Sequence, residues 1–198
     1  MIARLVAAPV VGRRVVAPYG DDGGFVTVVV SRGGPLLPNG VVLSGQVESG
    51  PVAVAGAEVW DPAIRRLTPV DLPADASLVG RSPESIGAEL IGRGPGLTPE
   101  GDDVVCGIAA VVAAGPWPRA SREAWVGALI GGNLRRRTTT LSATLLELAA
   151  RGMGPEPLQA VLAGRAGALE RLVAMGHTSG RAYARGAALG LALVGAGP

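Results

Sequence analysis

The chain has 198 residues, of which 48% are apolar and 17% charged, so it can bury a core and extensive disorder is excluded. All 18 basic residues are Arg, and the absence of Lys excludes Schiff-base chemistry and the Lys-dependent phosphate-loop and kinase motifs. One Cys and one His exclude an intrachain disulfide and a Cys/His zinc cluster, and a net charge of +2 does not indicate a nucleic-acid partner.

The first 80 residues contain short β-branched runs separated by turn residues. Residues 25–30 form the strongest predicted strand, because β-branched side chains fit a pleated surface. Further strands are predicted at residues 41–43, 52–54 and 57–60. Their hairpin-like spacing predicts a small antiparallel β-sheet or partial barrel over residues 1–80.

From about residue 81 the pattern becomes helical. Ser82 followed by Pro83 predicts a capped helix that ends near residue 90. Thr98 followed by Pro99 predicts in the same way that Thr98 caps the helix at residues 100–114. The later predicted helices cover residues 100–114, 121–134, 140–151, 157–175 with a break at Gly164 or Gly167, and 179–194. The fold class is therefore α+β, with an Ala- and Gly-rich helical bundle at residues 81–198 that forms one compact unit with the β-rich half.

A glycine-rich loop, residues 92–99, runs directly into the helix predicted at 100–114. Backbone amides and the positive end of the helix dipole at such a junction bind small anions, and Gly94 and Gly96 let the backbone approach a ligand closely. Three carboxylates, Glu100, Asp102 and Asp103, follow in the first turn. Acidic side chains also stabilise a helix start without a ligand, so the pattern leaves open which Asp braces the loop and which acts as general base or Mg²⁺ ligand.

The only His of the chain, His177, lies in a Gly-bracketed turn before the last predicted helix. An imidazole can transfer a proton near neutral pH, and amides at a helix start can hold an oxyanion. We therefore predict a catalytic role for His177 and anion binding by Thr178, Ser179 and Gly180. The alternative is that Thr178 or Ser179 caps the helix and His177 only fills the loop.

A third polar segment, residues 133–142, carries three Arg followed by three Thr. Because forked guanidinium donors bind carboxylates and phosphates, we assign Arg137, Thr138, Thr139 and Ser142 to anion binding. The alternative is a solvated basic helix end with a Thr cap. Cys106, inside an apolar helix, is predicted to be a buried packing residue.

These segments together resemble the AllH-type family, one member of which is a subunit of bacterial oxamate carbamoyltransferase. The resemblance rests on residues 94–103, GPGLTPEGDD, which are similar to the family's GLTPxGDD signature, and on segments 138–142, 149–152 and 176–180. It implies chemistry on oxalurate, phosphate, oxamate and carbamoyl phosphate, carried out together with other carbamoyltransferase subunits.

We therefore predict an enzyme, or an enzyme subunit, that acts on a small carboxylate, carbamoyl or phosphate compound where loops 94–103 and 176–180 face each other. The predicted catalytic residues are Asp102, Asp103 and His177. The predicted anion-binding residues are Gly94, Gly96, Thr98, Arg137, Thr138, Thr139, Ser142, Thr178, Ser179 and Gly180. No cofactor is assigned, and a Mg²⁺ ion on Asp102 or Asp103 stays open.

Two alternatives from other classes stay open beside this prediction. One is a non-catalytic scaffold or a small-anion-sensing subunit, and the other is a stand-alone amide hydrolase or cyclase. In each case we expect a cytoplasmic homo-oligomer with no nucleic-acid or membrane partner, since no apolar run in the C-terminal half reaches the roughly 20 residues of a membrane span.

Overall fold

The computed structural model describes residues 35–40, 60–72 and 75–197 with their side chains, and elsewhere only the backbone of short strands. These strands are β1 (Pro9–Val11), β2 (Arg14–Val15), β3 (Val28–Ser31), β4 (Gly40–Leu43) and β5 (Gly50–Pro51). β1 pairs antiparallel with β2 and β5, whereas β3 and β4 pair in parallel, which hairpin spacing did not predict. The strand predicted at 52–54 and most of that at 57–60 lie outside the described residues, so the antiparallel sheet or partial barrel stays a prediction.

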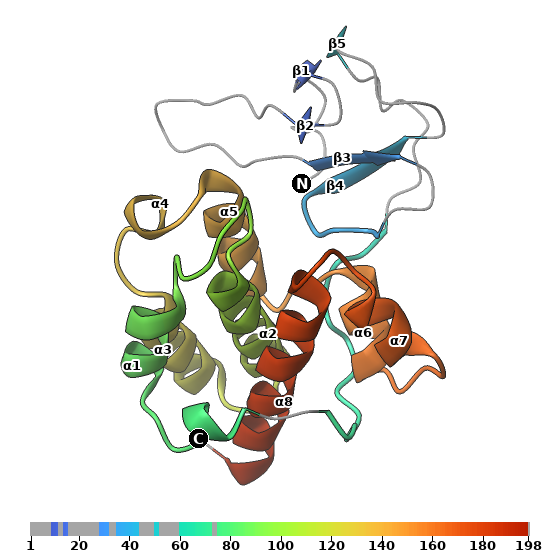
Figure 1. The fold of residues 1–198 in the computed structure, drawn as a ribbon. Coiled ribbons are helices and arrows are strands. Elements are labelled where there is room, and N and C mark those ends of the chain that lie inside the picture. Colours follow the sequence, from blue (N-terminus) through green and yellow to red (C-terminus); the bar gives the residue numbers. More distant parts are fainter. Residues whose placement is uncertain are drawn as a thin grey trace.

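The described residues beyond 75 are helical, as the sequence predicts. A short 3-10 helix at Ala76–Leu78 precedes α1 (Pro83–Leu90), α2 (Glu100–Ala114), α3 (Arg119–Ile130), α4 (Leu134–Arg137), α5 (Thr140–Ala149), α6 (Glu156–Leu162), α7 (Ala168–Val173) and α8 (Ser179–Ala196). α2 and α8 lie side by side in the middle of the bundle, with α1 and α3 on one side and α6 and α7 on the other (Figure 1). The starts of the two central helices therefore determine where their preceding loops lie.

Helix α2 is the buried centre of this bundle. Every residue from Gly101 to Val112 is buried, which fits a helix that is apolar on all sides. Its closest neighbour is α8, and small residues at their crossing let the two backbones approach. A Cβ at Gly186 of α8 would lie 2.0 Å from the carbonyl oxygen of Val104 in α2, so the crossing requires glycine there.

Local sequence signals predicted several helix boundaries correctly. The hydroxyl of Ser82 accepts a hydrogen bond from the amide of Ser85 at the start of α1. Gly164 and Gly167, at the predicted break, both have positive φ, +70° and +67°, and they separate α6 from α7. Cys106 is buried, as predicted.

Two boundary predictions were wrong. Thr98 does not cap α2, because Pro99 is the N-cap residue and no side chain caps the helix. The helix predicted over 121–134 is α3, which begins directly after Pro118 and ends at Ile130. Gly131 is extended and Gly132 has a φ of +88°, and these two glycines interrupt the helix before the short α4.

Candidate functional site

The glycine-rich loop between α1 and α2 contains three glycines in the left-handed region of backbone space. Gly92, Gly94 and Gly96 have φ values of +85°, +123° and +94°, which side-chain-bearing residues rarely adopt. At Gly92 a side chain is also excluded sterically, since a Cβ would lie 2.1 Å from the carbonyl oxygen of Arg137. Residues 93–97 are exposed, so the loop presents its backbone to the surface immediately before α2.

Asp102 holds this loop against the first turn of α2. Its side chain is buried, and one carboxylate oxygen accepts a hydrogen bond from the amide of Gly92, with an N···O distance of 2.7 Å. The other oxygen accepts a hydrogen bond from the hydroxyl of Thr138, which follows α4. Asp102 therefore fits the bracing role that the sequence left open between the two neighbouring Asp residues.

The start of α5 holds the tip of the same loop. The hydroxyl of Thr139 donates to the carbonyl oxygen of Leu97 at 2.6 Å, and the hydroxyl of Ser142 lies 3.4 Å from it. Thr139 is also the N-cap of α5, since its hydroxyl oxygen accepts a hydrogen bond from the amide of Ser142, so the predicted Thr cap is confirmed. The hydroxyls of Thr138, Thr139 and Ser142 thus bind the loop and its Asp.

The start of α8 meets the glycine-rich loop through two half-buried hydroxyls. Oγ1 of Thr98 lies 3.3 Å from Oγ of Ser179, and the Ser179 hydroxyl is also hydrogen-bonded to the carboxyl group of Asp103. This contact brings together the two loops that the sequence predicts to face each other. Because strong O–H···O bonds are about 2.7–2.8 Å long, the Thr98–Ser179 contact is weak.

Asp103 lies directly beneath this contact through its bond to Ser179. Its side chain is 1% exposed, and burial raises the pKa of its carboxyl to about 7 against the lowering effect of the Ser179 hydrogen bond. The nearby charges of Asp102 and Glu100 also raise this pKa. One of its oxygens, Oδ2, is buried without a hydrogen-bond partner among the described residues. A buried acceptor of this kind is rare in a folded protein and needs a specific explanation.

Glu100, the third carboxylate of the turn, is paired with a residue that the sequence analysis did not identify. Arg185 of α8 donates to Glu100 at 2.7 Å and also to Asp75, which precedes the 3-10 helix. Hydrogen bonds from Ser77 and then from Arg185 lower the pKa of Asp75 to about 2. No local pattern could reveal Arg185, because its partners lie 85 and 110 residues away along the chain.

A second pair that sequence reasoning missed lies deeper between α2 and α8. The Cys106 thiol and the Tyr183 hydroxyl are hydrogen-bonded to each other and buried. Burial raises the pKa of both groups well above their usual range, so both stay protonated at neutral pH. This pair forms a neutral polar floor below Asp103.

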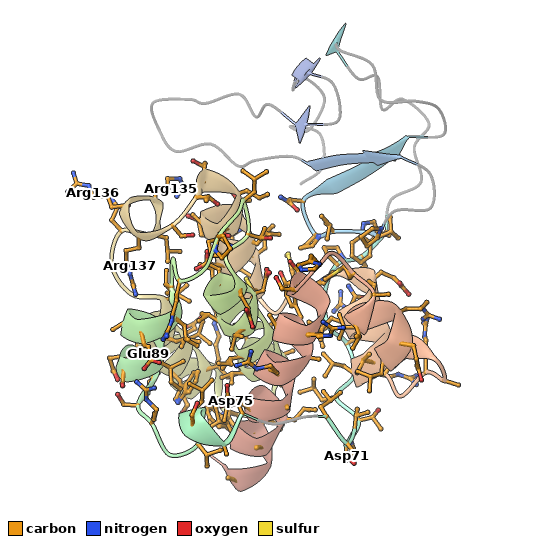
Figure 2. All side chains as sticks on the ribbon, in the orientation of Figure 1. Asp71, Asp75, Glu89, Arg135, Arg136 and Arg137 are labelled. Atoms are coloured by element: carbon orange, nitrogen blue, oxygen red, sulfur yellow. The ribbon has the colours of Figure 1, made fainter. Side chains whose placement is uncertain are left out.

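The structure does not bring the Arg137 guanidinium to this cluster. It donates to the carbonyl oxygens of Gly131 and Gly87, each at 2.6 Å, and lines a surface hollow of about 460 Å³ beside α1 and α3. Figure 2 shows that Arg135, Arg136 and Arg137 leave α4 in different directions. A three-residue helix end cannot aim neighbouring side chains at one point, since successive residues are rotated by about 100°.

The turn before α8 contributes less than the sequence suggested. The amide of Gly180 is hydrogen-bonded to the carbonyl oxygen of Met175 at 2.9 Å, so it does not point to a ligand. Thr178 is the N-cap residue without a side-chain capping bond, and the alternative that Thr178 or Ser179 caps α8 is therefore wrong. His177 and Thr178 are exposed beside the loop contact.

A comparison with protein families identifies the chain. The family model described as oxamate carbamoyltransferase subunit AllH matches residues 90–191, just over half of the sequence. The chain belongs to the AllH family. Neither a curated protein nor a solved structure matches it. The AllH match begins at the last residue of α1 and ends within α8, so it contains both loops and all the predicted site residues.

Two further findings bear on the function of this AllH chain. Within residues 35–40, 60–72 and 75–197, no group of three or more His, Cys, Asp or Glu side chains is placed to hold a metal ion. In the same part of the chain, no helix combines the length and the apolar character that crossing a bilayer requires. A Mg²⁺ ion on Asp102 or Asp103 therefore stays an open prediction.

Proposed function

We propose that this AllH-family chain is a carbamoyltransferase subunit that binds a small carboxylate or carbamoyl compound where loops 92–99 and 176–180 meet. The observation that carries the proposal is the buried Asp103 oxygen, which has no hydrogen-bond partner among the described residues. It lies in the first turn of α2, where the helix dipole favours negative charge. A bound compound would supply the partner that the described part of the chain does not.

The groups around this oxygen suit acid–base chemistry at neutral pH. Transfer of a carbamoyl group to an amide nitrogen removes one N–H proton, and the reverse reaction returns it. A carboxyl with a pKa of about 7 can both accept and return a proton near neutrality, which makes Asp103 the proposed general base. Ser179 and Thr98 offer hydroxyls to the ligand, Asp102 positions the loop, and the exposed His177 is a second proton carrier.

The same geometry also supports the alternative of a small-anion-sensing subunit. Arg137 donates to backbone carbonyls and Arg185 to two carboxylates, so neither guanidinium is directed at the ligand. A phosphate or carboxylate at the exposed loop would then depend on cations from another subunit. In that case Asp103 would bind the compound and a partner would carry out the transfer.

An assay of carbamoyl transfer from carbamoyl phosphate to oxamate tests the proposal. The release of phosphate is measured as its readout. The chain is assayed in the complex with the subunits that copurify with it. Asp103→Asn should reduce turnover by about 10²- to 10⁴-fold, because the amide cannot take up the proton. His177→Gln should cause a smaller loss.

Asp61→Asn is the matched control for these variants, because it makes the same change at an exposed carboxylate paired only with Arg65 and Ala63. Full turnover in both Asp103→Asn and His177→Gln would remove the catalytic proposal. Unchanged turnover with weaker oxamate binding in Asp103→Asn would favour the sensing subunit instead.

A further inference from the structure

The first turn of α2 carries three carboxylates, Glu100, Asp102 and Asp103, which differ in their hydrogen-bond partners. Both oxygens of Asp102 accept hydrogen bonds from Gly92 and Thr138. Glu100 is bonded to Arg185, and Asp103 is bonded to Ser179 through its carboxyl group. Among the carboxylate oxygens of this turn, only Oδ2 of Asp103 is buried without a hydrogen-bond partner in the described part of the chain. The chemistry of that oxygen therefore decides which group can lie against it.

The charges around Asp103 disfavour a second carboxylate at that position. Asp102 and Glu100 flank it on α2, and their charges already oppose its ionisation. The guanidinium of Arg185, on α8, is bonded to Glu100 and Asp75. From α8, Asp103 is faced by the Ser179 hydroxyl and the neutral pair of Tyr183 and Cys106. A ligand carboxylate against Oδ2 would bring two like charges into contact in a buried place.

A donor on the ligand would instead satisfy the oxygen without an added charge. An amide or carbamoyl nitrogen carries N–H groups that a carboxylate oxygen accepts, and such charge-assisted bonds are strong. The exposed glycine backbone of residues 94–96, just before the start of α2, suits the opposite, anionic end of a small compound. The two features together match a short molecule with a carboxylate at one end and an amide at the other.

We infer that the unpartnered oxygen of Asp103 accepts a hydrogen bond from an amide nitrogen of the bound compound, so that Asp103 selects an amide over a second carboxylate. This inference rests on the proposed function, because it assigns a specificity role within the same site. The Thr98 and Ser179 hydroxyls lie 3.3 Å apart and Ser179 is bonded to Asp103, so a ligand at Asp103 would lie close to both hydroxyls.

Oxamate and oxalate are the matched probes for this inference, since they differ only by an amide in place of a carboxylate. Binding of each to the full chain is measured by calorimetry at pH 8, where Asp103 is ionised. We expect oxamate to bind at least about tenfold more tightly than oxalate, because a site that uses a substrate N–H rejects an analogue without it. Asp103→Asn should remove or reverse this preference, since an amide side chain can donate to oxalate. Asp61→Asn should keep it.

The pH dependence of binding gives a second readout that needs no variant. An N–H donated to Asp103 favours its ionised form, so oxamate binding should strengthen by about tenfold in total between pH 6 and pH 8. Oxalate favours the protonated carboxyl, so its binding should weaken over the same range. Both slopes should disappear in Asp103→Asn, and slopes that persist there would overturn the inference.

The outcomes separate the inference from the proposed function. Equal binding of the two compounds with no effect of Asp103→Asn would overturn the selection by Asp103 while leaving an anion site at the loops. Binding of neither compound would overturn both. If Asp103→Asn fails to fold, parallel pH slopes for the two compounds in the wild-type chain would still contradict the inference.

Discussion

The two loops that meet at Thr98 and Ser179 are held in place in different ways. The loop at 92–99 is held by side chains from elsewhere, because Asp102 binds the amide of Gly92 and Thr139 binds the carbonyl of Leu97. The turn at 176–180 is held by its own backbone, through the bond from the Gly180 amide to the Met175 carbonyl. Substitution of its side-chain partners should therefore loosen the first loop. The conformation of the second loop depends instead on close backbone packing.

This difference separates the two neighbouring Asp residues by role. Asp102 belongs to the first loop, and each of its two oxygens already accepts a hydrogen bond within the chain. Asp103 lies between the loops, with one bond to the second loop through Ser179 and one oxygen without a partner in the described chain. The variants below test this division, beginning with the largest expected effect.

The pH dependence of stability should identify Asp103 as the carboxyl whose ionisation is disfavoured by burial. Its pKa is about 7 in the folded chain against 3.8 for the free group, so the folded state binds more protons between these values. Stability should therefore fall as the pH rises from about 4 to 7, by up to about 4 kcal/mol, and then level off. Urea unfolding of the wild type and of Asp103→Asn across this range measures the difference.

The difference between the two pH profiles reports the contribution of Asp103 alone, without that of the other titrating groups. Asp75, whose pKa is about 2, stabilises the fold above its unfolded pKa and loses this contribution only at lower pH. If wild type and Asp103→Asn have the same pH profile between 4 and 7, Asp103 is not the buried carboxyl with a raised pKa described above, and its role as general base loses its support.

A methyl group at Gly180 should be the most damaging single change to the second loop. A Cβ there would lie 1.8 Å from the carbonyl oxygen of Leu172, and neither backbone can move without shifting α7 against α8. Gly180→Ala should lower the free energy of unfolding by about 3 kcal/mol. Gly96→Ala, where a Cβ meets nothing within 4 Å but φ is positive, should cost only about 1 kcal/mol.

Chemical denaturation of the two glycine variants measures these values. Gly127→Ala, on α3 with open space around its Cβ, is the control and should be neutral or slightly stabilising. Equal losses for Gly180→Ala and Gly96→Ala would contradict the view that the second loop depends on packing and the first on side-chain bonds.

The sequence predicted the features that depend on neighbours in the chain. Helix starts such as Ser82 and the break at Gly164 and Gly167 follow from caps and glycine conformations within a few residues. The two loops were also found, because glycines, hydroxyls and acids at a helix start form a local pattern. The sequence could not predict which distant residue each polar side chain would bind.

Three examples show the physical reason. The Thr98 hydroxyl contacts Ser179, 81 residues away, and does not cap α2. The Arg137 guanidinium binds the carbonyl of Gly87, 50 residues away, and is not directed at the ligand site. The choice between Asp102 and Asp103 depended on Thr138, 36 residues from Asp102. Each outcome is decided by how α2 packs against distant elements, which no local spacing records.

The bond between Asp102 and Thr138 should account for part of the stability of the first loop. Asp102→Ala leaves the Gly92 amide and the Thr138 hydroxyl without their acceptor in a buried place, and we expect a loss of about 2 kcal/mol. Thr138→Val removes only the hydroxyl and should cost about 1 kcal/mol. The double variant should lose less than the sum of the two, by about 1 kcal/mol, because the shared bond is removed once.

This double-mutant cycle also tests the assignment of Asp102 as a positioning residue. Thr138→Val should loosen the loop and weaken oxamate binding without changing its pH dependence, since Asp103 and its free oxygen are left in place. A pH dependence that disappears in Thr138→Val would contradict the assignment of Asp102 as a residue that only positions the loop. Additive losses in the cycle would show that the first loop is held without this bond, and the contrast between the two loops would then fail.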